Sequence, residues 1–267
     1  MPAALRFASV TAVALDDFEA ALIPTGETDI FVRRAGSGPP LLLLHGFPQT
    51  HLMWRDVAPR LASRYTVVCA DLRGYGQSGC PASTPDHAPY AKRAMAADMV
   101  AAMARLRFDR FAVAGHDRGG RVAYRLALDH PRRVDRIAVL DVSRPQKRGR
   151  GPTRASPSPS GPGLAQPAPL PERLLAAVPD AVIDDALGGW GSPAGVFNDG
   201  VRAAYVAALR DPDRLHAICE EYRAAATLDR AHDEADQARG RRITCPLLAL
   251  WSAQGPLGTW YEAADGR

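Results

Sequence analysis

The most restrictive feature of this chain is the segment Phe111–Arg121, in which an apolar run leads directly into a glycine-rich turn. The run predicts a buried strand, and a helix is predicted to continue from Val122 to Asp129. Asp117 stands at the tip of the turn between them, flanked by Gly115, Gly119 and Gly120. Glycine permits both a tight turn and the close packing of helix on strand. The segment therefore has the strand–turn–helix context of a G-x-S-x-G nucleophile elbow, with aspartate in the place of serine.

A carboxylate at the tip of such a turn favours one kind of chemistry. It needs no base to become a nucleophile, so Asp117 is suited to displacing a leaving group from carbon. The product is an ester that water must later cleave. The alternative interpretation is a glycine-rich turn that the aspartate only caps.

Further apolar runs alternate with helical stretches around this segment. The runs at Leu41–His45, Tyr65–Asp71 and Arg136–Asp141 are rich in valine, leucine and isoleucine, and helices are predicted at residues 53–63, 90–106 and 122–130. This alternation is typical of a mostly parallel sheet with helices on both faces. Ligands bind such sheets at the carboxyl ends of the strands, where this chain places His45, Asp71, Asp117 and Asp141.

Four motifs in these segments resemble the α/β-hydrolase superfamily, and within it most closely the haloacetate (fluoroacetate) dehalogenases. In order, they are HGFPQT at 45–50, DLRGYGQS at 71–78, KRAM at 92–95 and GHDRGGRVAYRLALD at 115–129. The likeness covers residues 28–142 and returns at 164–173, 219–224 and 245–251. The resemblance implies an α/β-hydrolase fold with an inserted helical cap.

Two arginines after the nucleophile carry the part of the resemblance that is specific to dehalogenases. Epoxide hydrolases and haloalkane dehalogenases usually have tryptophan directly after the nucleophilic aspartate, where this chain has Arg118. With Arg121 one helical turn after Asp117, the chain offers two guanidinium groups to a carboxylate. The alternative for Arg121 is a solvated helix residue.

The resemblance implies a role for each remaining site residue. A short 2-haloacid would dock on the arginines while Asp117 attacks the carbon that bears the halogen, and Asp141 would orient a histidine that activates water. Backbone N–H groups near Phe47 and Arg118 would form the oxyanion hole. Tyr222 would stabilise the departing halide, and Trp190 would line the same pocket or simply pack in the cap. No metal or cofactor is expected.

None of the histidines fits the role of general base that the resemblance requires. They are His45, His51, His87, His116, His130, His216 and His232. In this superfamily the catalytic histidine follows the last strand, and we expect that strand and its histidine loop to be missing from this chain. His232 is expected on a solvated, charged helix face at residues 229–236.

Three functions therefore stay open. The first is a haloacetate dehalogenase-like hydrolase, impaired or inactive as the chain stands. The second is an epoxide hydrolase-like enzyme that uses the same ester chemistry, with Tyr205 and Tyr222 available to protonate the epoxide oxygen. The third is a non-catalytic, truncated homologue. The arginine pair favours an anionic substrate.

The expected domain organisation is a core at 1–142, a cap region at 143–240 and the end of the core at 241–267. Residues 143–163 hold five of the lysines and arginines, five prolines and no acid, so they are expected to be disordered. The rest of the chain has 28 basic and 29 acidic residues. We interpret 143–163 as a frame disturbance in the coding sequence, because a neighbouring frame can encode a family-like cap segment. A natural low-complexity linker is the alternative, and resequencing would decide.

Composition limits the partners and the compartment. The basic charge is local and lacks interleaved aromatic residues, which argues against nucleic-acid binding. No apolar run is long enough to cross a membrane, and a signal peptide is not expected from residues 1–15. The four cysteines have no paired spacing, and Cys69 and Cys245 are expected in apolar strands, so we expect reduced thiols in the cytoplasm. Homodimerisation is implied by the resemblance alone.

Overall fold

The computed structural model describes residues 15–142, 163–188, 192 and 195–252 of the chain. Within these residues, seven strands form one sheet in the order β1-β2-β4-β3-β5-β6-β7. Their bounds are β1 Glu19–Pro24, β2 Asp29–Ala35, β3 Pro40–Leu44, β4 Thr66–Ala70, β5 Phe111–His116, β6 Val134–Leu140 and β7 Leu247–Leu250. Some of the predictions above concern residues that lie outside the described part of the chain, namely 143–162, Trp190 and 253–267.

Most of the sheet is parallel, which confirms the predicted fold class. Strands β4, β3, β5, β6 and β7 run parallel to one another, whereas β1–β2 and β2–β4 are antiparallel pairs. The strands β3 to β6 match the predicted apolar runs to within two residues. The hairpin β1–β2 was not predicted, because β1 is a largely exposed edge strand with a weak apolar signal.

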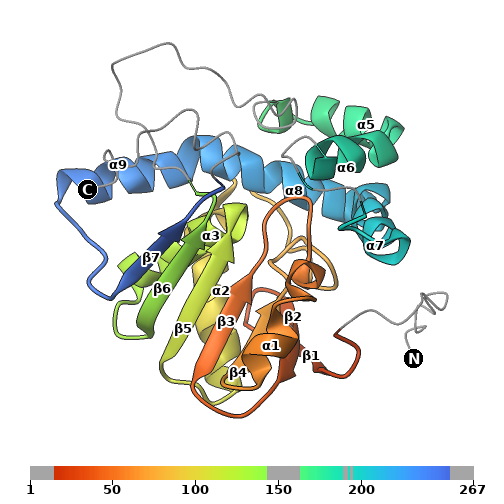
Figure 1. Ribbon diagram of the computed structural model, residues 1–267. Coiled ribbons are helices and arrows are strands. Elements are labelled where there is room, and N and C mark those ends of the chain that lie inside the picture. Colours follow the sequence, from red (N-terminus) through yellow and green to blue (C-terminus); the bar gives the residue numbers. More distant parts are fainter. Residues whose placement is uncertain (1–14, 143–162, 189–191, 193–194, 253–267) are drawn as a thin grey trace.

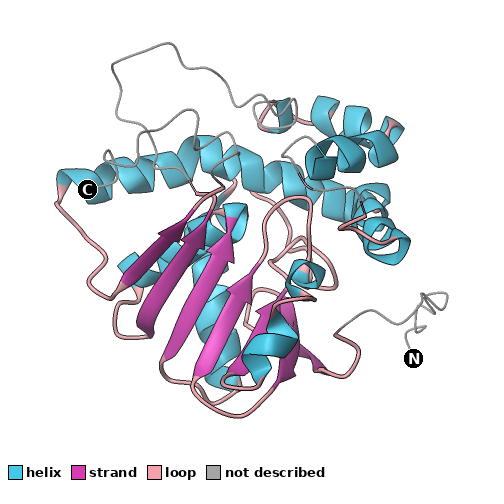
Figure 2. Ribbon diagram, viewed as in Figure 1, coloured by secondary structure: helices cyan, strands magenta, loops and turns pink. Residues whose placement is uncertain are grey.

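Helices cover both faces of the sheet (Figure 1). On one face lie α2 and α3, and on the other lies the short helix α1, beside Trp54. The helical elements are η1 His51–Trp54, α1 Ala58–Ala62, η2 Ala88–Tyr90, α2 Lys92–Arg105, α3 Asp117–Asp129, α5 Leu170–Ala177, α6 Pro179–Gly188, α7 Asp199–Arg210, α8 Pro212–Ala224, η3 Ala225–Asp229 and α9 Arg230–Ala238. Figure 2 shows the later helices crossing over one end of the fan of strands.

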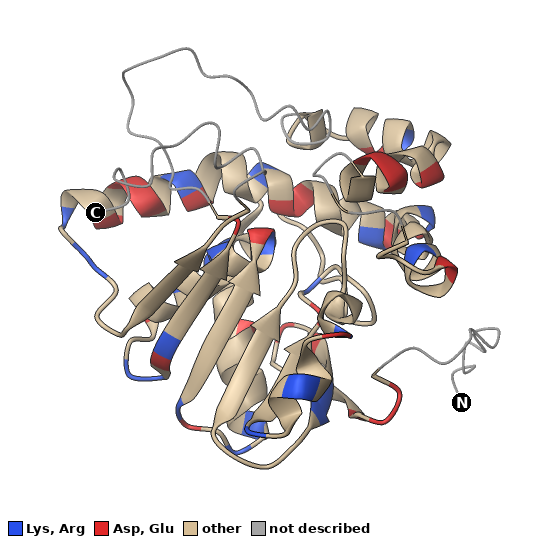
Figure 3. Cartoon of the chain, in the orientation of Figure 1, with Lys and Arg blue, Asp and Glu red and all other residues tan. Residues whose placement is uncertain are grey.

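The helices α8, η3 and α9 follow one another as a continuous rod above the sheet (Figure 1). Charges of both signs alternate along it (Figure 3). The expectation that residues 229–236 form a solvated helix face holds for only one side of the helix: Arg230 and Glu234 are exposed, whereas Asp229, Asp233 and Asp236 are buried. Asp233 and Asp236 both pair with the buried Arg125 of α3, and they face it because their spacing puts them on one side of α9.

The strand β7 forms an edge of the described sheet and pairs with β6. Its apolar side chains are about half exposed: Leu247, Leu248 and Leu250, with Trp251 just beyond. Cys69 lies in β4 as predicted, but Cys245 precedes β7 instead of lying in it, because the strand begins only after Pro246. All four cysteines are free.

No helix within the described residues has the length and the apolar character needed to cross a membrane.

The close packing around the glycines of the nucleophile turn predicts that adding a methyl group there lowers the stability of the fold. A Cβ on Gly119 would lie 2.4 Å from the carbonyl oxygen of His45, which is backbone and cannot rotate away. We expect Gly119→Ala to lower the free energy of unfolding in urea by about 1–3 kcal/mol, the usual cost of overpacking.

The matched control is Gly188→Ala at the end of α6. No atom lies within 4 Å of its added Cβ, so this variant is expected to unfold like the parent protein or slightly later. Equal stability of the two variants would contradict the close packing of α3 against the loop after β3.

Candidate active site

The candidate nucleophile, Asp117, is the first residue of α3 and follows β5 directly. Its φ angle is +47°, a left-handed conformation that costs a non-glycine residue about 1–3 kcal/mol and persists only where the surroundings enforce it. Gly46 and Gly119 supply that enforcement, because added Cβ atoms would collide with Asp117 and with the backbone after β3. The fold therefore holds this carboxylate in a strained position at the end of the strand.

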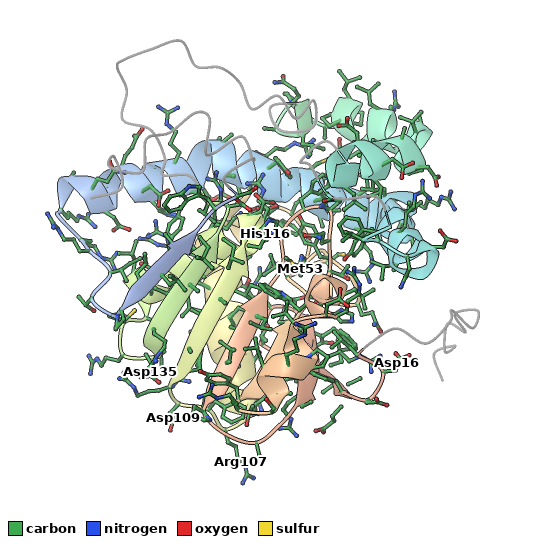
Figure 4. The ribbon with its side chains drawn as sticks, viewed as in Figure 1. Asp16, Met53, Arg107, Asp109, His116 and Asp135 are labelled. Atoms are coloured by element: carbon green, nitrogen blue, oxygen red, sulfur yellow. The ribbon has the colours of Figure 1, made fainter. Side chains whose placement is uncertain are left out.

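The end of the sheet on which this site lies is visible in Figure 4. His116, the last residue of β5, lies beneath the overlying helices, whereas Asp109 and Asp135 mark the opposite end of the strands. Since β3, β5 and β6 are parallel, their carboxyl ends meet at the same edge.

A backbone amide fixes the orientation of the Asp117 side chain. The N–H of Phe47, in the loop after β3, donates a hydrogen bond to Oδ2 of Asp117 at 3.1 Å. The other carboxylate oxygen is the one left to attack a substrate. If it formed an ester, Oδ2 would become the ester carbonyl oxygen, and Phe47 N–H would already point at it. This is the position that an oxyanion-hole donor needs.

Arg118 and Tyr222 lie against each other beside the nucleophile. The guanidinium carbon of Arg118 is 3.5 Å from the centre of the Tyr222 ring, a close cation–π contact. The Tyr222 ring also packs edge-on against Phe47, with ring centres 5.7 Å apart. The structure thus brings Asp117 together with three of the residues predicted to bind substrate.

Beneath Arg118 lies a carboxylate that sequence reasoning missed. Glu221, fully buried on α8, is 3.5 Å from Nε of Arg118 and forms an ion pair with the buried Lys92 of α2. The hydroxyl of Tyr75 donates a hydrogen bond to its Oε2 at 2.9 Å. The signal available in the sequence was a charged residue directly before Tyr222, within a motif that also carried the family resemblance.

These contacts settle the charges in the buried cluster. Burial alone would raise the pKa of Glu221, but Arg118 and Lys92 outweigh it and hold that pKa below its usual value. Burial would lower the pKa of Arg118, whereas Glu221 raises it further, so the guanidinium stays charged. Burial also raises the pKa of Tyr222, which keeps its hydroxyl protonated. The phenol is therefore a hydrogen-bond donor.

Arg121 differs from Arg118 in having no charge partner in the described part of the chain. It lies one helical turn after Asp117 on α3 and is partly exposed. Among the described residues it makes neither a hydrogen bond nor an ion pair. The described residues thus offset part of the charge of Arg118 and leave that of Arg121 unpaired.

Asp141, the predicted orienting acid, follows β6 and is partly buried. Its φ angle is +50°, and its Oδ1 accepts a hydrogen bond from the N–H of Ser252 at 2.9 Å. Within the described part of the chain, no histidine forms a hydrogen bond or an ion pair with it. The predicted role of Asp141 stays a prediction.

Two histidines that follow β3 in the sequence, His45 and His51, make hydrogen bonds that stabilise the fold. His45 is fully buried, its Nε2 accepts the N–H of Leu72 at 3.0 Å, and burial lowers its pKa. The backbone N–H of His51 donates a hydrogen bond to Oδ1 of the buried Asp71 at 2.7 Å. Nδ1 of the His51 ring lies 2.9 Å from the same oxygen. These bonds tie the loops after β3 and β4 together, which supports the site from below.

Tyr205, considered above as an epoxide-protonating residue, packs in the core against Phe197. Its buried hydroxyl has no hydrogen-bond partner among the described residues.

Comparison with known proteins shows the family to which the chain belongs. A family model described as the alpha/beta hydrolase fold matches residues 39–265. A fluoroacetate dehalogenase from Burkholderia sp is 44% identical over 252 residues, which cover 92% of this chain and 82% of that protein. A candidate alpha/beta hydrolase from Nostoc sp PCC 7120 superposes with a TM-score of 0.84 at 42% identity, over 94% of this chain and 86% of that one. A candidate epoxide hydrolase from Pseudomonas aeruginosa gives a TM-score of 0.80 at 39% identity, over 96% and 84%.

The buried carboxylate beneath Arg118 predicts a pH-dependent stability. Glu221→Gln leaves the charges of Arg118 and Lys92 without their shared partner, so we expect it to cost about 3–5 kcal/mol in urea unfolding at neutral pH. The folded pKa of Glu221 lies below the free value of 4.5. Its stabilisation is therefore complete above that pH and is lost as the pH falls. The difference between parent and variant should shrink below pH 4.5.

Glu234→Gln serves as the control, because Glu234 forms an exposed ion pair with Arg230 on α9. Such pairs contribute less than about 1 kcal/mol. A Glu221→Gln protein as stable as this control at neutral pH would refute the network.

Proposed function

Because this chain belongs to the α/β-hydrolase fold family and is a homologue of a fluoroacetate dehalogenase, we propose that it displaces halide from short 2-haloacids. Arg118, which is paired with Glu221, and Arg121, which has no ion-pair partner among the described residues, both follow Asp117 on α3, and this arrangement supports the proposal most directly. A small anionic substrate has two cations to dock on, one fixed and one free. Neither would help a neutral ester or a neutral epoxide in the same way.

In the first step, the free oxygen of Asp117 attacks the carbon that bears the halogen. A carbon–oxygen bond forms, the carbon–halogen bond breaks, and the halide leaves with the bonding electron pair. Docking the substrate carboxylate on Arg118 and Arg121 fixes the in-line geometry that such a displacement requires. The protonated hydroxyl of Tyr222 is a candidate donor for the departing halide.

In the second step, water attacks the ester carbonyl and releases the hydroxyacid from Asp117. Phe47 N–H supports the charge that develops on Oδ2. We propose that Asp141 orients the base for this step. No described histidine occupies that place, so the alkylation step is the one that the described residues themselves support.

The helices α5 to α9 lie over the carboxyl ends of the strands (Figure 1). We propose that residues 143–240 are the cap that covers the site, and that the core comprises residues 1–142 and 241–267. The four free thiols accord with a reducing compartment, for which the cytoplasm is our proposal.

Epoxide opening is the second candidate, favoured by one contact. The phenol of Tyr222 lies beside the nucleophile, where it could protonate an epoxide oxygen while Asp117 attacks carbon. The structural likeness to a candidate epoxide hydrolase accords with it. Arg121, which has no ion-pair partner within the described residues, favours the haloacid.

The arginine pair predicts a separable loss of binding. We expect Arg121→Ala to weaken binding of chloroacetate by about 2–5 kcal/mol in isothermal titration, the range for removing one partner of a close charge pair. Its folding stability should not change, because Arg121 has no ion-pair partner among the described residues. Arg118→Ala should lose binding and also stability, since Glu221 loses a partner.

The control is Arg105→Ala, an exposed arginine at the end of α2. If Arg121→Ala bound chloroacetate as tightly as this control, the arginine pair would not be the carboxylate site.

The nucleophile is tested by trapping its ester. We expect bromoacetate to alkylate Asp117 and release bromide, leaving a carboxymethyl ester that peptide mass spectrometry places on that residue. Without a positioned base, the ester should hydrolyse about 10²–10⁴-fold more slowly than with one. The four free cysteines must first be blocked or mapped separately.

Asp117→Asn removes the nucleophilic carboxylate with little change of shape, and it should show no such ester. Bromide release at the parent rate in this variant would overturn the mechanism. Sustained turnover by the parent protein would show that another residue serves as base. Diol formation from a neutral epoxide, without halide release from haloacids, would select the alternative.

A further inference from the structure

Three side chains outside the Asp117 site form a hydrogen-bonded chain of serine, histidine and glutamate. Ser83 Oγ lies 3.0 Å from Nε2 of His216, and Nδ1 of the same ring lies 3.2 Å from Oε1 of Glu172. Ser83 comes from the loop before η2, His216 from α8 and Glu172 from α5. We propose that Ser83 is the nucleophile of a second site, which takes acyl groups from small uncharged esters.

The acid of this triad is held in place by Arg223. This guanidinium donates to both oxygens of Glu172, at 2.8 and 3.1 Å, and to Glu220 at 2.9 Å. Burial raises the pKa of Glu172, but its bonds to Arg223 and His216 outweigh this and lower it, so the group is a carboxylate. A fixed carboxylate sets the tautomer of His216: Nδ1 carries the proton, and Nε2 is free to accept one from Ser83.

The serine and histidine are accessible to a reagent. Ser83 is exposed, and 42% of the His216 side chain is exposed. Arg223, which holds Glu172, also lines a cavity of about 250 Å³, whose apolar wall is formed by Ala165, Pro167, Ala168 and Ala226. Its volume is below the usual range for drug-sized ligands, so it suits a short acyl chain.

The charges around this cavity also select the ligand. Arg223 is neutralised by Glu172 and Glu220, and Glu220 in turn contacts Nδ1 of His87 at 2.8 Å. Every ionic side chain that lines the cavity is thus already paired with another. An uncharged ester meets no unbalanced charge there, whereas an anionic haloacid gains nothing. The two sites therefore differ in the substrate class that they favour.

The acyl transfer balances without a further reactant. Ser83 Oγ attacks the ester carbonyl, its proton passes to Nε2 of His216, and the bond to the leaving oxygen breaks. The leaving alcohol or phenol recovers that proton, and the acyl group stays on Ser83 until water removes it. Among the described side chains, only His216 is hydrogen-bonded to the Ser83 hydroxyl. We therefore expect reaction with activated esters, whose leaving groups need little assistance.

The test uses the full chain in an Asp117→Asn background, so that the first site cannot contribute. The probes are p-nitrophenyl acetate, followed by release of nitrophenolate, and an alkyl fluorophosphonate, followed by peptide mass spectrometry. In the second reaction an oxygen–phosphorus bond forms on Ser83 and fluoride leaves. We expect both probes to modify Ser83.

Ser83→Ala should abolish labelling of that peptide. The control, Ser63→Ala, removes another exposed serine whose hydroxyl binds only the carbonyl of Arg60, and it should leave labelling unchanged. His216→Asn should slow the modification of Ser83 about 10²–10⁴-fold, the usual contribution of a general base. Glu172→Gln should slow it less, because the histidine is retained.

Two results would overturn the proposal. One is the absence of probe on Ser83 in a chain that melts cooperatively. The other is an unchanged labelling rate in His216→Asn, which would make Ser83 an ordinary exposed hydroxyl and the triad a surface clamp. Ser83→Ala removes only an exposed hydroxyl, so its folding is not at risk and it keeps the test decisive. Since the haloacid site is disabled throughout, neither result bears on the proposed dehalogenase function.

Discussion

The buried carboxylate of Glu221 is the interaction on which the rest of the site depends. An isolated carboxylate in the protein interior would cost several kcal/mol, so it needs cations and donors around it. The fold supplies Arg118 from α3, Lys92 from α2 and the Tyr75 hydroxyl from the turn after β4. One residue of α8 thereby fixes the helix against three parts of the core. Because Tyr222 follows Glu221 directly, the same contact places its ring on Arg118.

The same network separates two arginines that the sequence presents as a pair. Arg118 is stacked on Tyr222 and shares Glu221 with Lys92, so its position is fixed and part of its charge is offset. Arg121 is partly exposed and has no such partner among the described residues. A fixed cation gives direction to an incoming carboxylate, and a free one gives it net attraction. Under the proposed function, this division would let a buried site keep its geometry and still attract an anion.

The sequence predicted those structural features that depend on a local or continuous run of residues. The runs that form β3 to β6 and the turn at Asp117 were found because their apolar residues and glycines are contiguous. The edge hairpin β1–β2 was missed because β1 is short and largely exposed, so its residues give only a weak apolar pattern. The burial of Glu221, Asp233 and Asp236 was missed for another reason. A charged residue looks solvated until its partner, here Arg118, Lys92 or Arg125, is brought to it by tertiary structure. Trp190 and residues 143–162 lie outside the described chain.

The π-helical turn η3 joins α8 to α9. It affects the directions in which the buried acids of the two helices point, Glu221 on α8 and Asp233 and Asp236 on α9. Each residue of an α-helix advances by about 100° around the axis, so an extra residue within a turn rotates everything beyond it by that amount. The rotation lets Glu221 on α8 reach Lys92 and Arg118 while Asp233 and Asp236 on α9 face Arg125. Within the turn, the hydroxyl of Thr227 donates a hydrogen bond to the carbonyl of Arg223, four residues earlier, at 2.7 Å. Asp229, at its end, receives the backbone N–H of Lys92 at 2.8 Å. A regular α-helix through 225–229 would rotate the α9 acids by about 100° relative to Glu221, so the irregular turn favours the arrangement in which both groups of acids face the core.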